Sequence, residues 1–200
     1  MKTLAEVFII ESLDPDDEGN GRFEGSIISR MLRLHGKAPK YRYIRTRKDF
    51  LKAIKQFGQS KYRYLHISAH ADADGMCTTN LDEIAFEELA EILCPHLAGC
   101  RLFLSACSMV HENLAKEIIP RSGCNSVVGP TEDIYFSDAA IVWSSIYHLM
   151  FSEDSDRMSR KHLREKLTKV CELFQVQLAY FSKSKQKKRG YTKDLLTRAK

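Results

Sequence analysis

The chain has 200 residues and a formal net charge of +5, with 44% hydrophobic and 28% charged residues. This composition is typical of an ordinary globular protein and argues against a disordered or fibrous chain. No run approaches the ~18 apolar residues that would cross a bilayer. The run from Val7 to Ile10 is too short for a signal peptide, and Glu6 and Glu11 bracket it. We therefore expect a cytoplasmic protein with no membrane segment.

Hydrophobic periodicity divides the first 151 residues into alternating strands and helices. An acidic, glycine-bearing loop follows the first strand, and Gly58, Pro95 and Pro120 end three of the helices. The polar stretch from Asp72 to Asp82 indicates a loop or a small hairpin. We expect strands at 6–12, 41–46, 64–69, 101–106 and 126–129, and helices at 23–34, 50–57, 86–93, 114–118 and 138–151.

This alternation predicts a three-layer α/β fold, with a mainly parallel central sheet and helices on both faces. From Ser159 onward, the apolar residues between Leu163 and Phe181 follow a near-heptad stripe. The stripe predicts one long helix packed on the sheet, and a partner-binding or self-associating helix is the alternative. We therefore expect a main domain at 1–151 and a C-terminal helical extension with a basic tail at 152–200, packed on the same domain.

The basic tail runs from Lys183 to Gly190 and contains five basic residues and no acidic one. Clusters of Lys and Arg bind phosphate without sequence preference, so a nucleic-acid contact is one interpretation. A solvated tail is the other, and it is favoured because no aromatic interleaving or nucleic-acid motif accompanies the run.

The six cysteines do not follow the paired spacing of a secreted disulfide scaffold. Reduced thiols are the simplest interpretation. Cys94, His96 and Cys100 could in principle act as metal ligands, but no Cys-x-x-Cys motif accompanies them. We accordingly expect neither a metal nor a cofactor.

Two of the expected strands end at side chains that can perform catalysis. The run YLHISA leads to His70, and the run RLFLSA leads to Cys107. Neighbouring parallel strands present their carboxyl ends at one edge of a sheet, so we expect these residues to meet there. A thiol beside an imidazole is a nucleophile with its base. A helix beginning after Cys107, with Ser108 as its N-cap, would favour the thiolate.

Each of these residues also has a structural interpretation. His70 taken alone fits a partly buried histidine whose hydrogen bonds are satisfied. Cys107 taken alone fits a small buried hydrophobic residue, which is the commonest environment of a free cysteine. The combination of both residues at strand ends favours a catalytic pair.

In these residues the chain resembles the caspase-like cysteine peptidases, in particular the CHAT-type branch found in many bacteria. That group has one hydrophobic strand ending in His and a second ending in a Ser-Ala-Cys turn, which match His70 and Cys107. The likeness continues through a strand, a Gly-Pro turn and a long helix at 124–150, and it covers roughly positions 4 to 151. The residue after the His is Ala71, where the family usually has Gly.

The resemblance implies a cysteine endopeptidase that cleaves protein or peptide substrates through a His70–Cys107 dyad. It also implies an oxyanion hole formed by the backbone N–H groups of Cys107 and Ala71. Small peptidases of this group often act in bacterial defence or cell-death systems, so a regulatory sensor or activator protein is an implied partner. A catalytically silent caspase-like module that binds a partner protein is the alternative.

The resemblance also implies a location for the specificity pocket. In the caspase-like fold, the pocket for the residue before the cut is built by the loop after the first strand and the loop after the strand that follows the Cys. An acidic pocket would select Arg or Lys and repel Asp. The alternative is that these carboxylates only keep surface loops solvated. The acidic residues of the two loops are Asp14, Asp16, Asp17, Glu18, Glu132 and Asp133.

Overall fold

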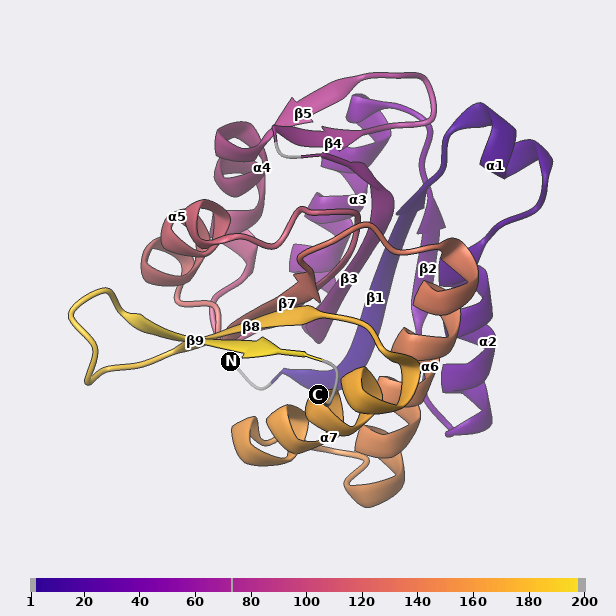
Figure 1. Ribbon diagram of the computed structural model, residues 1–200. Coiled ribbons are helices and arrows are strands. Elements are labelled where there is room, and N and C mark those ends of the chain that lie inside the picture. Colours follow the sequence, from indigo (N-terminus) through magenta and orange to yellow (C-terminus); the bar gives the residue numbers. More distant parts are fainter. Residues whose placement is uncertain (1–2, 73, 198–200) are drawn as a thin grey trace.

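The computed structural model describes residues 3–72 and 74–197. The strands within this part of the chain form one sheet (Figure 1). They are β1 (Leu4–Ser12), β2 (Lys40–Tyr43), β3 (Tyr62–Ala71), β4 (Gly75–Cys77), β5 (Glu83–Ala85), β6 (Arg101–Ser105), β7 (Ser126–Pro130), β8 (Leu178–Lys183) and β9 (Tyr191–Leu196).

The strand order is β2-β1-β3-β6-β7-β8-β9, and the β4–β5 hairpin extends from the end of β3. Neighbours from β2 to β7 are parallel, whereas β8 and β9 add antiparallel strands at one edge. The hairpin confirms the expectation for the polar stretch from Asp72 to Asp82.

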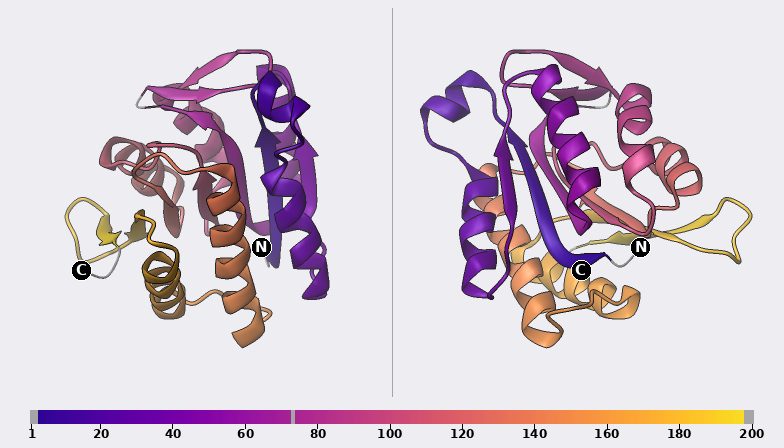
Figure 2. Two further views of the ribbon diagram at one scale, coloured as in Figure 1. Left: turned by 45° about the vertical axis from the view of Figure 1, so that its right-hand side comes forward. Right: turned by 180° about the vertical axis from the view of Figure 1, so that it is seen from behind.

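Helices cover both faces of this sheet (Figure 2). One face carries the helices that follow β1 and β7, and the opposite face carries those that follow β2, β5 and β6. The predicted three-layer α/β fold is thereby confirmed. The first face has α2 (Glu24–Leu34), α6 (Phe136–Glu153) and α7 (Arg160–Phe174), and the second has α3 (Arg47–Ser60), α4 (Phe86–Leu93) and α5 (Glu112–Ser122).

The central strands show why the sequence adopts these layers. In β1, Val7 and Ile9 pack against the layer of α2 and α6, whereas Phe8 and Ile10 pack against the layer of α3. Side chains alternate between the two faces of a strand, so a strand covered on both faces needs an unbroken apolar run. The sequence Val-Phe-Ile-Ile of β1 meets this requirement.

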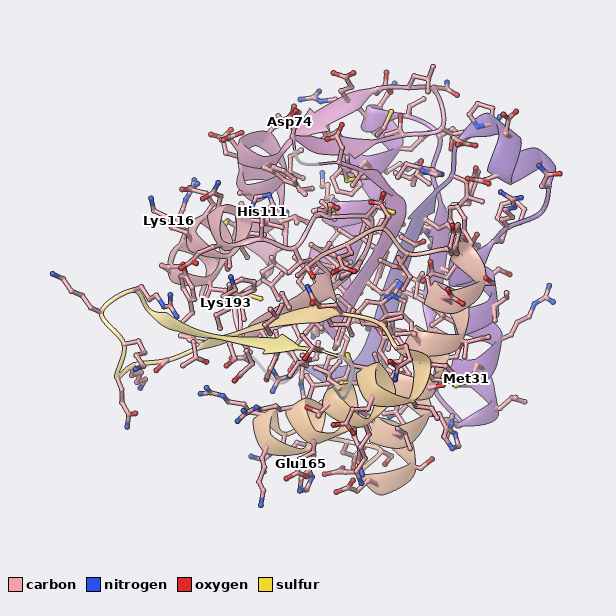
Figure 3. The ribbon with its side chains drawn as sticks, viewed as in Figure 1. Met31, Asp74, His111, Lys116, Glu165 and Lys193 are labelled. Carbon is pink, nitrogen blue, oxygen red and sulfur yellow. The ribbon has the colours of Figure 1, made fainter. Side chains whose placement is uncertain are left out.

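The sheet has a topological switch between β1 and β3. The chain passes from β1 to β2 on one side and then returns to β3 on the other side. Ligands of parallel α/β sheets bind beyond the carboxyl ends of the strands at such a switch. The ends of three strands are level there, because Ser12 of β1 pairs with Ala69 of β3, and Ser68 of β3 pairs with Ser105 of β6. In Figure 3 this is the end of the sheet near Asp74, away from Glu165 of α7.

The C-terminal region corrects one expectation. The single long helix predicted up to Phe181 is wrong, because α7 ends at Phe174 and Gln175 has a left-handed backbone with φ 56°. Residues Leu178–Lys183 instead pair with β7 as β8, so the expected helical extension is only partly helical.

The basic run from Lys183 to Gly190 belongs to the β8–β9 hairpin, which projects from the molecule (Figure 1). The run is therefore part of a hairpin at the sheet edge and not of a separate tail. The expectation that it does not bind nucleic acid stays a prediction. Among the described residues, no helix is both long and apolar enough to cross a membrane.

Candidate active site

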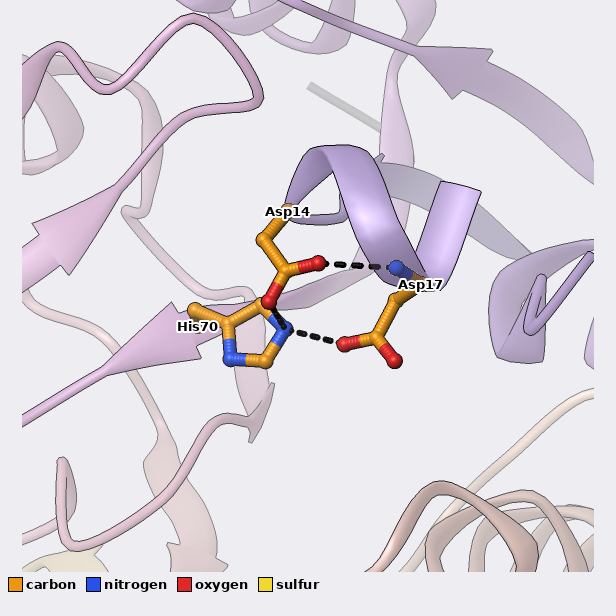
Figure 4. A group of neighbouring side chains, drawn as sticks. All are labelled: Asp14, Asp17 and His70. Atoms are coloured by element: carbon orange, nitrogen blue, oxygen red, sulfur yellow. Dashed lines mark hydrogen bonds and ion pairs between the residues drawn. The ribbon is translucent and has the colours of Figure 1, made fainter. Parts of the chain in front are cut away.

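His70 lies at the end of β3, between the neighbouring strands β1 and β6. Its Nε2 atom is 2.7 Å from Oδ2 of Asp17 and 3.4 Å from Oδ2 of Asp14 (Figure 4). The edge of its ring packs against Phe136 at the start of α6, with ring centroids 5.3 Å apart. The imidazole is therefore held from the β1 side and from the α6 side.

Asp17 is placed by a short helix, α1 (Pro15–Gly19), in the stretch after β1. The expectation of a loop without regular structure is therefore wrong for these residues. Asp14 is the N-cap of this helix, since its Oδ1 accepts the backbone N–H of Asp17 at 2.8 Å. Pro15 occupies the first turn, where its missing N–H costs nothing. The other oxygen of Asp17, Oδ1, accepts from Arg22 at 2.5 Å. Asp17 is 5% exposed, so this carboxylate is buried and fixed at both oxygens.

Cys107 lies two positions beyond the end of β6. Its Sγ is 3.8 Å from the carbonyl oxygen of Ile134, in the loop before α6. The next residue, Ser108, has φ 52°, a left-handed conformation that is uncommon outside glycine and that clusters at active-site turns. The turn therefore presents the thiol at the same sheet edge as His70.

The helix expected immediately after Cys107 begins later. Helix α5 starts at Glu112, and its N-cap is His111, whose Nδ1 accepts the N–H of Leu114 at 3.4 Å. The prediction that Ser108 caps this helix is therefore wrong. Because α5 begins at Glu112, its N-terminus does not lie at the Cys107 sulfur. The helix is therefore not expected to stabilise the thiolate.

His70 and Cys107 line one pocket of about 950 Å³ between the N-terminal ends of α2 and α6. Its floor is formed by the ends of β3 and β6, and its walls come from the loops after β1 and β7. The pocket therefore brings together the two residues that the sequence placed at strand ends. Its lining residues are Asp17, Arg22, Glu24, Ile27, Ala69, His70, Ser105, Ala106, Cys107, Asp133, Ile134, Tyr135, Phe136, Ser137, Ala139 and Ala140.

A buried carboxylate lies at the floor of this pocket. Oε2 of Glu24 accepts hydrogen bonds from the hydroxyl groups of Ser68 at 3.0 Å and Ser105 at 2.9 Å. These serines precede His70 and Cys107 by two residues each, and they pair across β3 and β6. Oε1 of Glu24 lies 3.5 Å from Nε2 of the fully buried His66. Glu24 therefore joins the two strands directly below the candidate catalytic residues.

A second buried carboxylate, Glu11, lies next to Glu24. It accepts the backbone N–H of Gly25 at 2.6 Å and the phenol of Tyr41 at 2.6 Å. Burial raises the pKa of Glu11 to about 7, and the charge of Glu24 acts in the same direction.

The acidic residues predicted for the specificity pocket separate into two groups. Asp17 and Asp133 line the pocket, and Asp133 also accepts from Ser108 at 3.4 Å. Asp16 and Glu132 are exposed and do not line it, and Glu18 forms an ion pair with Arg45 at 2.8 Å instead. Asp14 contacts His70 rather than lining the pocket.

Ala71, predicted to supply a backbone N–H for an oxyanion, pairs with Met76 of β4. The next pair is hydrogen-bonded, since the N–H of Asp72 donates to the carbonyl of Gly75 at 3.1 Å. Antiparallel pairs alternate between bonded and non-bonded, so the N–H of Ala71 points away from β4. The described non-glycine residues with positive φ are Lys61, Leu81, Ser108 and Gln175, so alanine fits at 71 without strain.

Asp14, Asp17 and His70 also form the group of potential metal ligands in the described part of the chain, with ligand atoms within 4.8 Å of one another. Cys94, His96 and Cys100 do not form such a group. All six cysteines are free thiols.

No family model and no curated protein matches this sequence. The solved structures that are similar in fold include two bacterial cysteine proteases and an insect caspase-1. A secreted cysteine protease from Bacteroides thetaiotaomicron is 9% identical with a TM-score of 0.60, and the match covers 91% of this chain and 67% of that chain. Caspase-1 from Spodoptera frugiperda is 11% identical with a TM-score of 0.52, over 97% and 86% of the two chains.

The third structure is gingipain R of Porphyromonas gingivalis, described as an Arg-specific cysteine proteinase. It is 12% identical with a TM-score of 0.55, and the match covers 84% of this chain and 41% of that chain. The chain thus spans less than half of gingipain R. At these identities the comparisons establish the fold, which is that of the caspase-like cysteine proteases.

The sequence missed one member of the site, Glu24, and did not predict the contact that a second member, Asp17, makes with His70. Glu24 looked like an ordinary first residue of a helix, and only the packing of α2 brings it under both strands. Asp17 was predicted to face the substrate, but it contacts His70. The local signal for this turn was present in the Asp-Pro-Asp-Asp run, which predicts a capped helical turn but not its tertiary partner.

Proposed function

We propose that the chain is a cysteine endopeptidase of the caspase-like type, with Cys107 as nucleophile and His70 as general acid and base. The observation that carries this proposal is that both residues line one pocket at the carboxyl edge of the adjacent parallel strands β3 and β6. The caspase-like fold of the cysteine proteases described above supports the same class of activity.

The proposed reaction has two acyl-transfer steps. In the first, the Cys107 thiolate attacks the scissile carbonyl carbon, the C–N bond breaks, and the His70 imidazolium gives its proton to the leaving amine. In the second, His70 takes a proton from water, the hydroxide attacks the thioester carbon, and the C–S bond breaks. The products are an amine and a carboxylic acid, and the Cys107 thiolate and the His70 imidazolium are regenerated.

The backbone N–H groups of Cys107 and Ala71 are proposed to bind the oxyanion that forms in both steps. The N–H of Ala71 is suited to this role because it points away from the β4 hairpin. A methyl group in place of the family's usual glycine hydrogen does not remove this donor.

We propose that the residue before the cut is Arg or Lys. The pocket is lined by the carboxylates of Asp17, Glu24 and Asp133, against the single guanidinium of Arg22. Arg22 is paired with Asp17, so Glu24 and Asp133 leave an excess of negative charge. Charge complementarity of this kind selects basic side chains and disfavours acidic ones.

The resemblance to CHAT-type peptidases extends this proposal to a biological setting. We propose a bacterial defence or cell-death role in the cytoplasm, with release by a sensor or activator protein. The free thiols of all six cysteines fit a reducing compartment.

A catalytically silent module that binds a partner is the second candidate. It was suggested by Ala71, where the related peptidases usually have glycine, but the structure accommodates alanine there without strain. The two candidates differ in whether peptide bonds are broken.

A peptide series that differs only at the residue before the cut tests both the activity and its preference. We expect Arg and Lys peptides to be cleaved at least ~10-fold faster than norleucine or Asp peptides, and Cys107→Ala to cleave none. Absence of cleavage by the wild type, or equal cleavage by Cys107→Ala, would contradict the endopeptidase. Cleavage without preference, or preference for Asp, would leave the peptidase activity standing but would overturn the acidic pocket and its proposed preference for Arg or Lys.

A further inference from the structure

The order of three strands suggests a third functional residue. From one side to the other, β1, β3 and β6 are adjacent and parallel, and their carboxyl ends are level. Asp17 follows β1, His70 ends β3, and Cys107 follows β6. His70 therefore lies on the central strand, with a carboxylate on one side and a thiol on the other.

The contact between Asp17 and His70 has the geometry of a charge-assisted hydrogen bond. The distance from Nε2 to Oδ2 is 2.7 Å, within the range for such bonds (Figure 4). Asp17 is 5% exposed, so water competes little for this contact. Its second oxygen is held by Arg22, and its backbone is held by the Asp14 cap of α1. The carboxylate is thus fixed before any substrate binds.

This contact decides which ring nitrogen is available for catalysis. When Nε2–H donates to Asp17, the neutral ring carries its lone pair on Nδ1. Nδ1 is then the atom that exchanges a proton with Cys107 and with the leaving amine. The same carboxylate stabilises the imidazolium that forms during the reaction, as the buried acid of a Ser-His-Asp triad does.

We propose that Asp17 is the positioning residue of this site, which fixes the tautomer and orientation of His70 so that the dyad works as an Asp17–His70–Cys107 triad. The proposal rests on the proposed peptidase function and replaces the substrate-binding role predicted for Asp17. The charged groups around His70 are Asp14 at the N-cap of α1, Asp17 on α1 and Arg22 behind Asp17, and the thiol of Cys107 lies across the pocket.

Asp17→Asn keeps the size of the side chain but presents an amide that can donate to Nε2 and so favour the wrong tautomer. We expect kcat on the best basic peptide to fall about 100-fold or more, because the reaction steps depend on the tautomer of His70. KM should rise by a smaller factor than kcat falls, since the change also leaves the Arg22 charge unpaired in the pocket. Asp17→Glu should recover part of kcat. Glu18→Gln is the matched control, since Glu18 is on the same helix but pairs with Arg45, and it should keep wild-type kcat.

NMR spectroscopy can test the hydrogen bond between Asp17 and His70 independently of enzyme activity. In ¹⁵N-histidine NMR spectra, the His70 signals, assigned by their loss in His70→Gln, should report a proton on Nε2 in the wild type and a changed tautomer in Asp17→Asn. Unchanged kcat in Asp17→Asn, or an unchanged His70 tautomer, would overturn the proposal. An inactive wild type with the expected tautomer would instead refute the peptidase function and leave the Asp17–His70 contact established.

Discussion

Two buried carboxylates, Glu11 and Glu24, support the site from below, and they differ in how their charge is satisfied. Glu24 receives two serine hydroxyls and lies near His66, whereas Glu11 receives one amide and one phenol. Burying a charged group costs free energy unless its partners compensate. Burial is the main reason that the pKa of Glu11 rises from its ordinary value of 4.5 to about 7.

The raised pKa of Glu11 predicts a pH-dependent stability. The folded protein binds this proton more tightly than the unfolded chain, so the stabilisation is full below about pH 4.5 and is lost as the pH rises to about 7. A tenfold change in an equilibrium constant corresponds to about 1.4 kcal/mol, so the loss is roughly 3 kcal/mol. Glu11→Gln should remove this component, which is measured as the free energy of unfolding in urea at pH 4.5 and 7.5.

A control variant separates the effect of Glu11 from that of the other titrating groups. Glu87→Gln, on the exposed surface of α4, should keep the wild-type pH dependence. A Glu11→Gln variant whose stability changes with pH in the same way as the wild type would contradict the raised pKa.

At the same scale, the sequence predicted that His70 and Cys107 lie at one edge of the sheet, but not which residues support them. His70 and Cys107 stand out because each ends an apolar run, which is a local pattern. Asp17 and Glu24 reach the site through the positions of α1 and α2 on the sheet, and no local pattern encodes that contact. Alanine in place of the family's usual glycine at position 71 causes no backbone strain, because the φ angle of Ala71 is not positive.

Among the elements, β8 is the strand that the hydrophobic periodicity wrongly predicted as part of a helix. Its side chains are buried on both faces of the sheet, with Ala179 and Phe181 toward the α5 layer and Leu178 and Tyr180 toward the α7 layer. A continuous apolar run of this length fits a buried helix or a buried strand equally well. No Gly or Pro separates it from α7, and the turn at Gln175 uses a non-glycine residue with positive φ. The sequence therefore looked like one uninterrupted helix.

The strand β7 depends on the small size of Gly129. A Cβ atom at this position would lie 2.5 Å from the carbonyl oxygen of Leu104 and would also collide with Val110. Because one contact is with backbone, β7 would have to move away from β6 to accept it. We expect Gly129→Ala to destabilise the fold by about 1–3 kcal/mol, measured by urea unfolding.

Gly19→Ala is the matched control for this substitution, since a Cβ at Gly19 meets nothing within 4 Å. It should change stability by less than about 0.5 kcal/mol. A Gly129→Ala variant as stable as Gly19→Ala would show that β6 and β7 do not pack as closely as described.

For the whole molecule, the architecture explains why the sequence was enough to predict which edge of the sheet carries the candidate site. In a parallel sheet with a topological switch between β1 and β3, the carboxyl ends of the strands lie at one edge. Residues that are distant in the sequence therefore lie close together there, whatever their local sequence. The alternation of apolar runs and helical stripes was enough to predict that edge. The antiparallel β8–β9 edge lies beyond this rule, and it was missed.

Covalent labelling of the intact chain tests the pairing of His70 and Cys107 most directly. A peptide with Arg before a thiol-directed electrophile, read by intact mass and peptide mapping, should add one label to the wild type, on Cys107. Cys107→Ala should take up none, and His70→Ala should react at least ~10-fold more slowly, because a base adjacent to the thiol raises the thiolate fraction. Labelling spread over the other five cysteines, or equal rates in His70→Ala and the wild type, would contradict a shared active site.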